Sequence, residues 1–221
     1  MRGKKLRFCG YYEDITMFIP TILEGNENSH VRIDLYSRLL MDRIVLVDGP
    51  ISQDLATSVC SQLIFLSSHA KGQDIYMYIN SPGGDVTAGF AIYDTMRYIS
   101  NPVSTVCLGY AASMGAFLLV GGEKGKRYSL PNSEILLHQP FAGIRGQVSD
   151  IEICAKNVIH KKHKMIRILS KNTGIEMKEL EKITDRDLFI TPEKAMKMGI
   201  IDRILENEDD LAVALTETAT S

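Results

Sequence analysis

The sequence predicts an α/β protein built around a mostly parallel β-sheet. Short apolar segments rich in β-branched residues alternate with segments whose apolar residues recur at helical spacing, the pattern of parallel strands joined by crossover helices. A Ser-Pro-Gly-Gly sequence marks a sharp turn after one of these strands. The composition, 45% hydrophobic and 24% charged over 221 residues, is typical of one globular domain with a substantial core.

The first half of the chain contains two strand–helix units. Residues 43–48 (RIVLVD) predict a strand, and the apolar spacing within residues 51–68 predicts the helix after it. Residues 74–80 (DIYMYIN) predict the next strand. Adjacent glycines take positive φ at little steric cost, so residues 81–84 predict a turn, followed by a helix over residues 86–99.

The next unit lies in an uncharged stretch, residues 102–122. Its length raises the possibility of a membrane helix. Proline, glycine, serine and threonine residues interrupt it, however, and divide it into a β-branched strand over residues 103–108 and a Leu-rich helix over residues 114–120. We therefore expect a buried strand, a turn and a helix, with function at the strand-to-helix turns.

Ser113 lies at that turn, within residues 109–116 (GYAASMGA). Small neighbours allow a substrate backbone to approach the hydroxyl, and a helix N-terminus offers unpaired amides where an oxyanion would form. Ser113 is thus a candidate nucleophile. The alternative is an ordinary serine N-cap, because the first glycine of the G-x-S-x-G elbow is missing.

His138 is the best-placed candidate base, because it ends the apolar segment 134–138 (EILLH) at the end of a predicted strand. A hydrogen-bonded core histidine is the alternative. The other histidines lie in polar or helical segments (His30, His69, His160 and His163). Asp185 and Asp187 offer two carboxylates to orient a base, or simply a surface turn, and spacing alone does not choose between them.

Four motifs, in this order and at these separations, resemble the ClpP peptidase family. They are 78–84 (YINSPGG), 109–116 (GYAASMGA), 137–140 (LHQP) and 185–187 (DRD). The resemblance covers residues 19–205 as a single peptidase domain. It leaves an N-terminal segment, residues 1–18, that could be a propeptide, and a C-terminal tail, residues 206–221, expected to be mobile. The turn at 81–84 alone is shared with the wider crotonase superfold.

The resemblance implies a ClpP/crotonase-like α/β fold with repeated β-β-α units, a mostly parallel sheet and a protruding handle helix. It implies a triad in which Ser113 is the nucleophile, His138 the general base and Asp187 the orienting acid. The amides of Gly84 and Met114 match the family's oxyanion hole. No metal and no cofactor is implied, since ATP is used by a partner unfoldase and not bound by this chain.

The family also implies partners. Its members stack two seven-membered rings, joined by a handle that corresponds here to residues 141–147 and a helix over residues 149–170. The rings dock a hexameric AAA+ chaperone of the ClpX, ClpA or ClpC type, and a second ClpP-type paralogue could share them. The matching docking positions are Tyr76, Tyr78, Tyr98, Val106, Leu108, Tyr128 and Leu205. Residues of these types suit pocket binding, but Val106 and Leu108 would equally suit an ordinary core.

Composition limits the partners and the cellular compartment that we expect for this chain. Lys and Arg number 25 against 27 Asp and Glu, a formal charge of −2 that indicates neither nucleic acid nor a membrane surface as a partner. The four cysteines are widely spaced and form no C-x-x-C pair, which favours a reducing, cytosolic-type compartment (Cys9, Cys60, Cys107 and Cys154). With the family resemblance, we expect a cytoplasm of the bacterial type.

The sequence therefore predicts a serine endopeptidase subunit that degrades unfolded polypeptides fed into a closed chamber by an AAA+ unfoldase. Two alternatives remain: a catalytically silent scaffold subunit of a mixed ring, and a crotonase-type acyl-CoA enzyme. Filled triad positions argue against both, although correct residues do not by themselves guarantee an aligned site.

Overall fold

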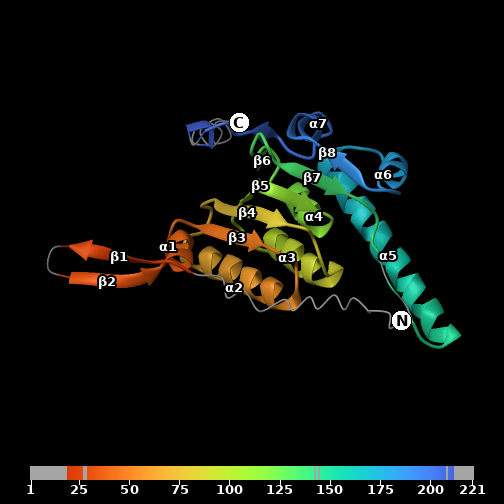
Figure 1. Cartoon of the computed structure of the whole chain (residues 1–221), viewed down its shortest axis with the longest axis horizontal. Coiled ribbons are helices and arrows are strands. Elements are labelled where there is room, and N and C mark those ends of the chain that lie inside the picture. The colour runs from red at the N-terminus through yellow and green to blue at the C-terminus, as the bar shows by residue number, and fades with distance from the viewer. Residues whose placement is uncertain (1–18, 27–28, 142, 144, 208, 212–221) are drawn as a thin grey trace, which may run out of the picture. The chain divides into compact units, whose positions relative to one another are not determined.

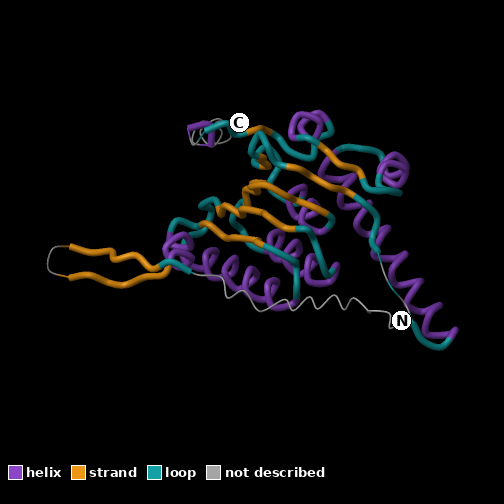
Figure 2. The backbone as a smooth tube through the Cα atoms, in the orientation of Figure 1, coloured by secondary structure: helices purple, strands orange, loops and turns teal. Residues whose placement is uncertain are grey.

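The computed structural model describes residues 19–26, 29–141, 143, 145–207 and 209–211, and it separates into two compact units (Figures 1 and 2). The first unit ends at Met41 and the second begins at Asp42. The predicted N-terminal segment, 1–18, and the end of the predicted tail, 212–221, lie outside the described residues. The domain boundaries taken from the sequence stay predictions.

The first unit is a hairpin followed by a short helix. Strands β1 (Thr21–Asn26) and β2 (Ser29–Asp34) pair antiparallel, and α1 (Leu35–Met41) follows directly. The Asp34 carboxylate begins this helix by accepting hydrogen bonds from the Ser37 hydroxyl at 2.5 Å and the Ser37 amide at 2.9 Å. These bonds stabilise the charged form and hold the pKa of Asp34 below its usual value.

The second unit is built on a seven-stranded sheet whose path runs β3-β4-β5-β6-β9, with β7 pairing β5 and β8 pairing β7. Every pair in this sheet is parallel except β7–β8, so the predicted α/β class and mostly parallel sheet are confirmed. The strands are β3 (Ile44–Asp48), β4 (Ile75–Ser81), β5 (Val103–Ala112), β6 (Arg127–Ser129), β7 (Glu134–Leu137), β8 (Leu188–Ile190) and β9 (Arg203–Ile204).

Helices join these strands. They are α2 (Gln53–His69), α3 (Val86–Tyr98), α4 (Met114–Val120), α5 (Val148–Thr173), α6 (Met177–Ile183) and α7 (Pro192–Lys197). Helices α2 and α3 pack side by side beneath the strands, and the N-terminal half of the long α5 extends away from the sheet (Figure 1). The predicted handle helix is therefore present, slightly longer at both ends than residues 149–170.

Strand β5 is longer than the sequence predicted. The prediction ended it at residue 108, but it continues to Ala112 because two different partners pair with its two halves. Residues Thr105 to Cys107 pair with β6, and residues Tyr110 to Ala112 pair with β7. The predicted nucleophile, Ser113, thus follows directly the strand at the centre of the sheet.

Helix α4 explains the uncharged stretch in the sequence. All of its residues are buried, and it contacts β5, β4 and β7. A helix buried on every side needs apolar residues all round, which matches the composition of a membrane segment without its length. Of the helices in the described part of the chain, none is long and apolar enough to span a membrane.

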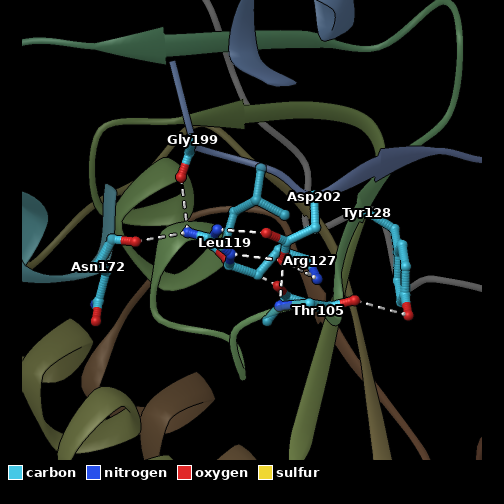
Figure 3. A network of polar contacts seen from close by, with 8 residues as sticks. Thr105, Leu119, Arg127, Tyr128, Asn172, Gly199 and Asp202 are labelled. Atoms are coloured by element: carbon cyan, nitrogen blue, oxygen red, sulfur yellow. Dashed lines mark hydrogen bonds and ion pairs between the residues drawn. The ribbon is translucent and has the colours of Figure 1, made fainter. Parts of the chain in front are cut away.

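A buried ion pair fixes the end of the second unit to the sheet (Figure 3). The Arg127 side chain on β6, 2% exposed, donates to both oxygens of Asp202, through Nε at 2.8 Å and Nη2 at 2.5 Å. Its Nη1 donates to the carbonyls of Asn172 at 3.0 Å and Gly199 at 2.8 Å. One guanidinium therefore connects β6, the end of α5 and the residues before β9.

Candidate active site

The antiparallel pairing of β7 with β8 brings two predicted triad residues together. Its registered pairs are Ile135 with Ile190, Leu136 with Phe189 and Leu137 with Leu188. Continued by one residue, the same register sets His138 opposite Asp187. Directly opposed residues on adjacent antiparallel strands have side chains on the same face, so the base and the acid become neighbours.

The distance between the two side chains agrees with this register. His138 Nδ1 lies 3.5 Å from Asp187 Oδ1, with 28% and 62% of the respective side chains exposed. This separation is longer than a well-formed N–H···O hydrogen bond, which spans about 2.7–3.2 Å. The register does not bring Asp185 opposite His138. The Asp185 carboxylate instead accepts a hydrogen bond from the Gln139 side chain.

Asp187 also lies close to strand β5. Strand β7 pairs with both β5 and β8, through Ala112 with Leu136 and Leu136 with Phe189. The candidate acid therefore lies one strand away from the strand end that carries the predicted nucleophile. Burial, and the carboxylates of Glu134 and Asp187, raise the pKa of the Tyr110 hydroxyl on β5.

Ser113 connects β5 to α4 with an unusual backbone conformation. Its φ of 53° and ψ of −116° fall in a region that non-glycine residues rarely adopt. The Ser113 amide donates to the Leu136 carbonyl on β7 at 2.8 Å, which ties the turn to the strand that leads to His138. Its side chain makes no cap hydrogen bond to the helix, so the N-cap alternative does not account for this serine.

The candidate nucleophile and the candidate base are close in the fold but not bonded. Among the described residues, no hydrogen bond joins the Ser113 hydroxyl to His138. Catalytic hydrogen bonds are often long without substrate and shorten in the reacting complex. The single chain thus holds the three side chains on neighbouring strand ends without the short contacts of an aligned triad.

The Gly83–Gly84 turn lies directly against Ser113 and Met114. A Cβ added to Gly83 would lie 2.6 Å from Ser113 Cβ and 3.0 Å from the Met114 nitrogen. Gly84, with φ of 152°, bridges to Ile51, whose amide donates to the Gly83 carbonyl at 2.8 Å. The residues that carry the two predicted oxyanion amides are thereby brought to one place.

Ser81 stabilises this turn, a contribution that the sequence analysis did not assign. Its buried hydroxyl donates to the Gly49 carbonyl at 2.7 Å and accepts from the Gly83 amide at 3.1 Å. A serine before Pro-Gly-Gly is a usual turn residue, so local sequence gives no sign of the long-range contact.

Two cavities flank the segment after His138. One of about 510 Å³ is lined by His138, Gln139, Pro140, Phe141 and the residues Asp185, Arg186 and Asp187. A second, of about 240 Å³, lies where Pro140 and Phe141 approach Gly84, Val158 and Lys161. An extended chain lying beside the candidate triad would have space for side chains in both.

Six of the seven predicted docking residues divide into two groups, and the seventh, Tyr76, lies half-buried on β4. Tyr78, Val106 and Tyr128 are registered neighbours across β4, β5 and β6, and Leu205 completes a cluster in which Val106, Tyr128 and Leu205 are buried. Leu211 packs against this cluster. Burial raises the pKa of Tyr128 to about 12, so its hydroxyl stays neutral. Tyr98 ends α3 with 85% exposure and Leu108 is 41% exposed.

A comparison with protein-family models gives one match that spans most of the chain. Residues 26–208 match the model described as Clp protease. The chain belongs to the Clp protease family. Family membership confirms the resemblance drawn from the four motifs and identifies the chain as a peptidase of the ClpP type. In this family, peptidase subunits form oligomeric rings that work with Clp chaperones.

Proposed function

We propose that this chain is an active serine endopeptidase subunit, with Ser113 as nucleophile, His138 as general base and Asp187 as the orienting acid. The observation that carries the proposal is the β7–β8 register, which sets His138 Nδ1 3.5 Å from Asp187 Oδ1 while β7 also accepts the Ser113 amide. A base held by an acid, beside a serine at a strained turn, is the arrangement that acyl transfer requires.

The reaction follows from these positions. His138 removes the Ser113 hydroxyl proton as the oxygen attacks the scissile carbonyl, and the amides of Gly84 and Met114 hold the resulting oxyanion. The proton then passes from His138 to the leaving amine, which leaves an acyl-enzyme. Water activated by the same histidine hydrolyses this ester and regenerates Ser113.

The proposal extends to partners and setting. The chain forms two stacked heptameric rings in a bacterial-type cytoplasm, and a hexameric AAA+ unfoldase supplies ATP-driven unfolding, with no cofactor in this chain. We place the docking site at the cluster of Tyr78, Val106, Tyr128 and Leu205, of which only Tyr78 is partly exposed and the other three are buried. An apolar side chain of the unfoldase entering there would have to displace Leu211, which packs against the cluster.

A fluorophosphonate probe tests the nucleophile. Intact-mass analysis of the assembled protein should show one adduct per chain, and Ser113→Ala should abolish the adduct and lower peptide hydrolysis by roughly 1,000-fold or more. A second serine, Ser133, is buried beside Cys107 and provides a matched control, Ser133→Ala, that should keep the adduct.

The absence of a bond between Ser113 and His138 favours one alternative, a silent scaffold subunit. An assembled wild-type ring that forms no adduct, alone or with an unfoldase present, would establish that alternative. An adduct that persists in Ser113→Ala would show that another residue is the nucleophile.

A further inference from the structure

Gln139, the residue directly after His138, holds the segment that carries Asp187. Its backbone amide donates to the Thr184 carbonyl at 2.8 Å. Its side-chain Nε2 donates to the Asp185 carbonyl at 3.0 Å and to the Asp185 carboxylate at 3.2 Å. A single residue therefore contacts two successive backbone carbonyls on the approach to Asp187.

The segment that Gln139 holds has little other support. Thr184 is buried and its hydroxyl donates to Leu180 in α6, but the side chains of Asp185, Arg186 and Asp187 are 61%, 94% and 62% exposed. Exposed backbone without packed side chains is the part of a fold that opens most readily. The pairing of Leu188 with Leu137 holds the C-terminal side of this segment, and the hydrogen bonds to Gln139 hold its N-terminal side.

Lys162 in α5 fixes Gln139 in turn. Its ammonium donates to Gln139 Oε1 at 2.8 Å. A lysine can only donate, so the amide oxygen must face α5 and the amide nitrogen must face Asp185. The opposite orientation of the amide would set two donors against each other at Lys162. The lysine thus selects the orientation of Gln139 that holds the Asp187 segment.

We propose that Gln139 and Lys162 are positioning residues for the candidate triad. Lys162 orients the Gln139 amide, and Gln139 holds the Asp185–Asp187 segment so that Asp187 faces His138. This inference rests on the proposed serine peptidase function and adds two residues that touch neither the nucleophile nor the base through their side chains. It also connects α5 to the acid through two hydrogen-bonded steps.

The kinetic test uses the assembled protein and a short fluorogenic peptide. Gln139→Ala should lower kcat by about 10- to 100-fold, as expected for a misplaced catalytic group, with KM changed less than about twofold. Gln139→Glu keeps the size of the side chain but cannot donate to Asp185, so its kcat should fall at least as far. A glutamate variant with wild-type kcat would overturn the proposal.

Lysine variants test the second step. Lys162→Met should lower kcat roughly fivefold, the value of one hydrogen bond, whereas Lys162→Arg should retain it within about twofold. The double variant Gln139→Ala/Lys162→Met should be no slower than Gln139→Ala, because both act through one contact. Lys156→Met is the matched control. It removes an exposed lysine from the same helix, paired with Glu152 at 2.8 Å, and should keep kcat.

Hydrogen–deuterium exchange separates this inference from the proposed function. A peptide covering residues 184–188 should exchange faster in Gln139→Ala and Lys162→Met than in the wild type and the Lys156→Met control. A wild type without hydrolysis or adduct would refute the peptidase proposal, while faster exchange would still support the anchoring role. Unchanged exchange and unchanged kcat in Lys162→Met would overturn the inference, even if Gln139→Ala failed to assemble.

Discussion

At the scale of single residues, two separate features of the structure require a glycine at position 83. Its φ of 89° favours glycine, and an added Cβ would lie 2.7 Å from the Ala112 carbonyl oxygen and 2.6 Å from Ser113 Cβ. These atoms belong to the Ser113 side chain and to the backbone directly before it, so neither can yield without moving Ser113. The turn and the nucleophile therefore position each other.

Gly83→Ala should lower both stability and reactivity. Gly72→Ala is the matched control, because Gly72 has a φ of 77° with nothing within 4 Å of an added Cβ. The control should cost about 1 kcal/mol from backbone strain alone, without loss of the fluorophosphonate adduct. Gly83→Ala should cost clearly more and slow adduct formation. If Gly83→Ala and Gly72→Ala had equal effects on denaturant unfolding and on labelling, the close contact between Gly83 and Ser113 would be contradicted.

Most of the candidate site residues could be predicted from the sequence and its family resemblance. The small residues around Ser113 are a local signal that made this serine a candidate nucleophile, whereas the two predicted oxyanion positions came from the family resemblance. The acid could not be chosen locally, because Asp185 and Asp187 lie in the same exposed segment. The choice depends on a long-range register, in which Leu137 pairs with Leu188. Ser81 and Gln139 were missed for the same reason.

At the scale of elements, the Arg127–Asp202 pair holds the last strand in place. The Asp202 carboxylate also accepts from the backbone amides of Gly125 at 2.8 Å and Arg127 at 3.0 Å. Strand β9 has only two residues, too few to be stable through its own ladder. The Arg127–Asp202 ion pair therefore holds the residues before β9 against β6.

Arg127→Ala should lower the free energy of unfolding by about 3 kcal/mol or more, because it removes the charge that pairs with Asp202 and leaves Asp202 Oδ1 and two backbone carbonyls without their donor. Guanidinium unfolding followed by circular dichroism measures this change. Arg97→Ala serves as a control, since the Arg97–Glu123 pair is exposed and 3.4 Å long, and it should change stability little. Similar losses of unfolding free energy in Arg127→Ala and Arg97→Ala would show that burial of an ion pair does not determine its contribution to stability.

Elements with a clear apolar pattern of their own were predicted well. Helices α2, α3 and α4 and strands β3 and β4 lie within a few residues of the expected ranges, because α2 and α3 show apolar residues at helical spacing and β3 and α4 are continuous apolar segments. Strands β8 and β9, of three and two residues, have no period to read and are defined only by their partners. The extension of β5 likewise depends on β7.

At the scale of the whole molecule, α5 has two different halves. Met165, Ile166 and Leu169 in its C-terminal half are buried. In the N-terminal half, Ile151 and Ile153 are 39% and 66% exposed. A helix that begins with exposed apolar residues and ends with buried ones is expected to bury its first half against another chain. This supports the proposed contact between rings.

Ile153→Lys should therefore separate the rings. Light scattering or sedimentation velocity should show a shift from fourteen chains to seven, since burying a lysine ammonium in an apolar interface is costly. Met177→Lys changes another exposed apolar residue, on α6, and should leave assembly unchanged. An unaltered fourteen-chain particle in Ile153→Lys would place the ring contact elsewhere.

The backbone conformation of Ser113 also bears on how such subunits evolve. A glycine would adopt its φ of 53° with less strain than any other residue, so loss of the nucleophile to glycine would make the fold more stable. Drift under selection for folding alone would therefore remove this serine quickly. On the proposed mechanism the serine is retained for its hydroxyl, and a duplicated subunit released from that selection is expected to lose activity while gaining stability.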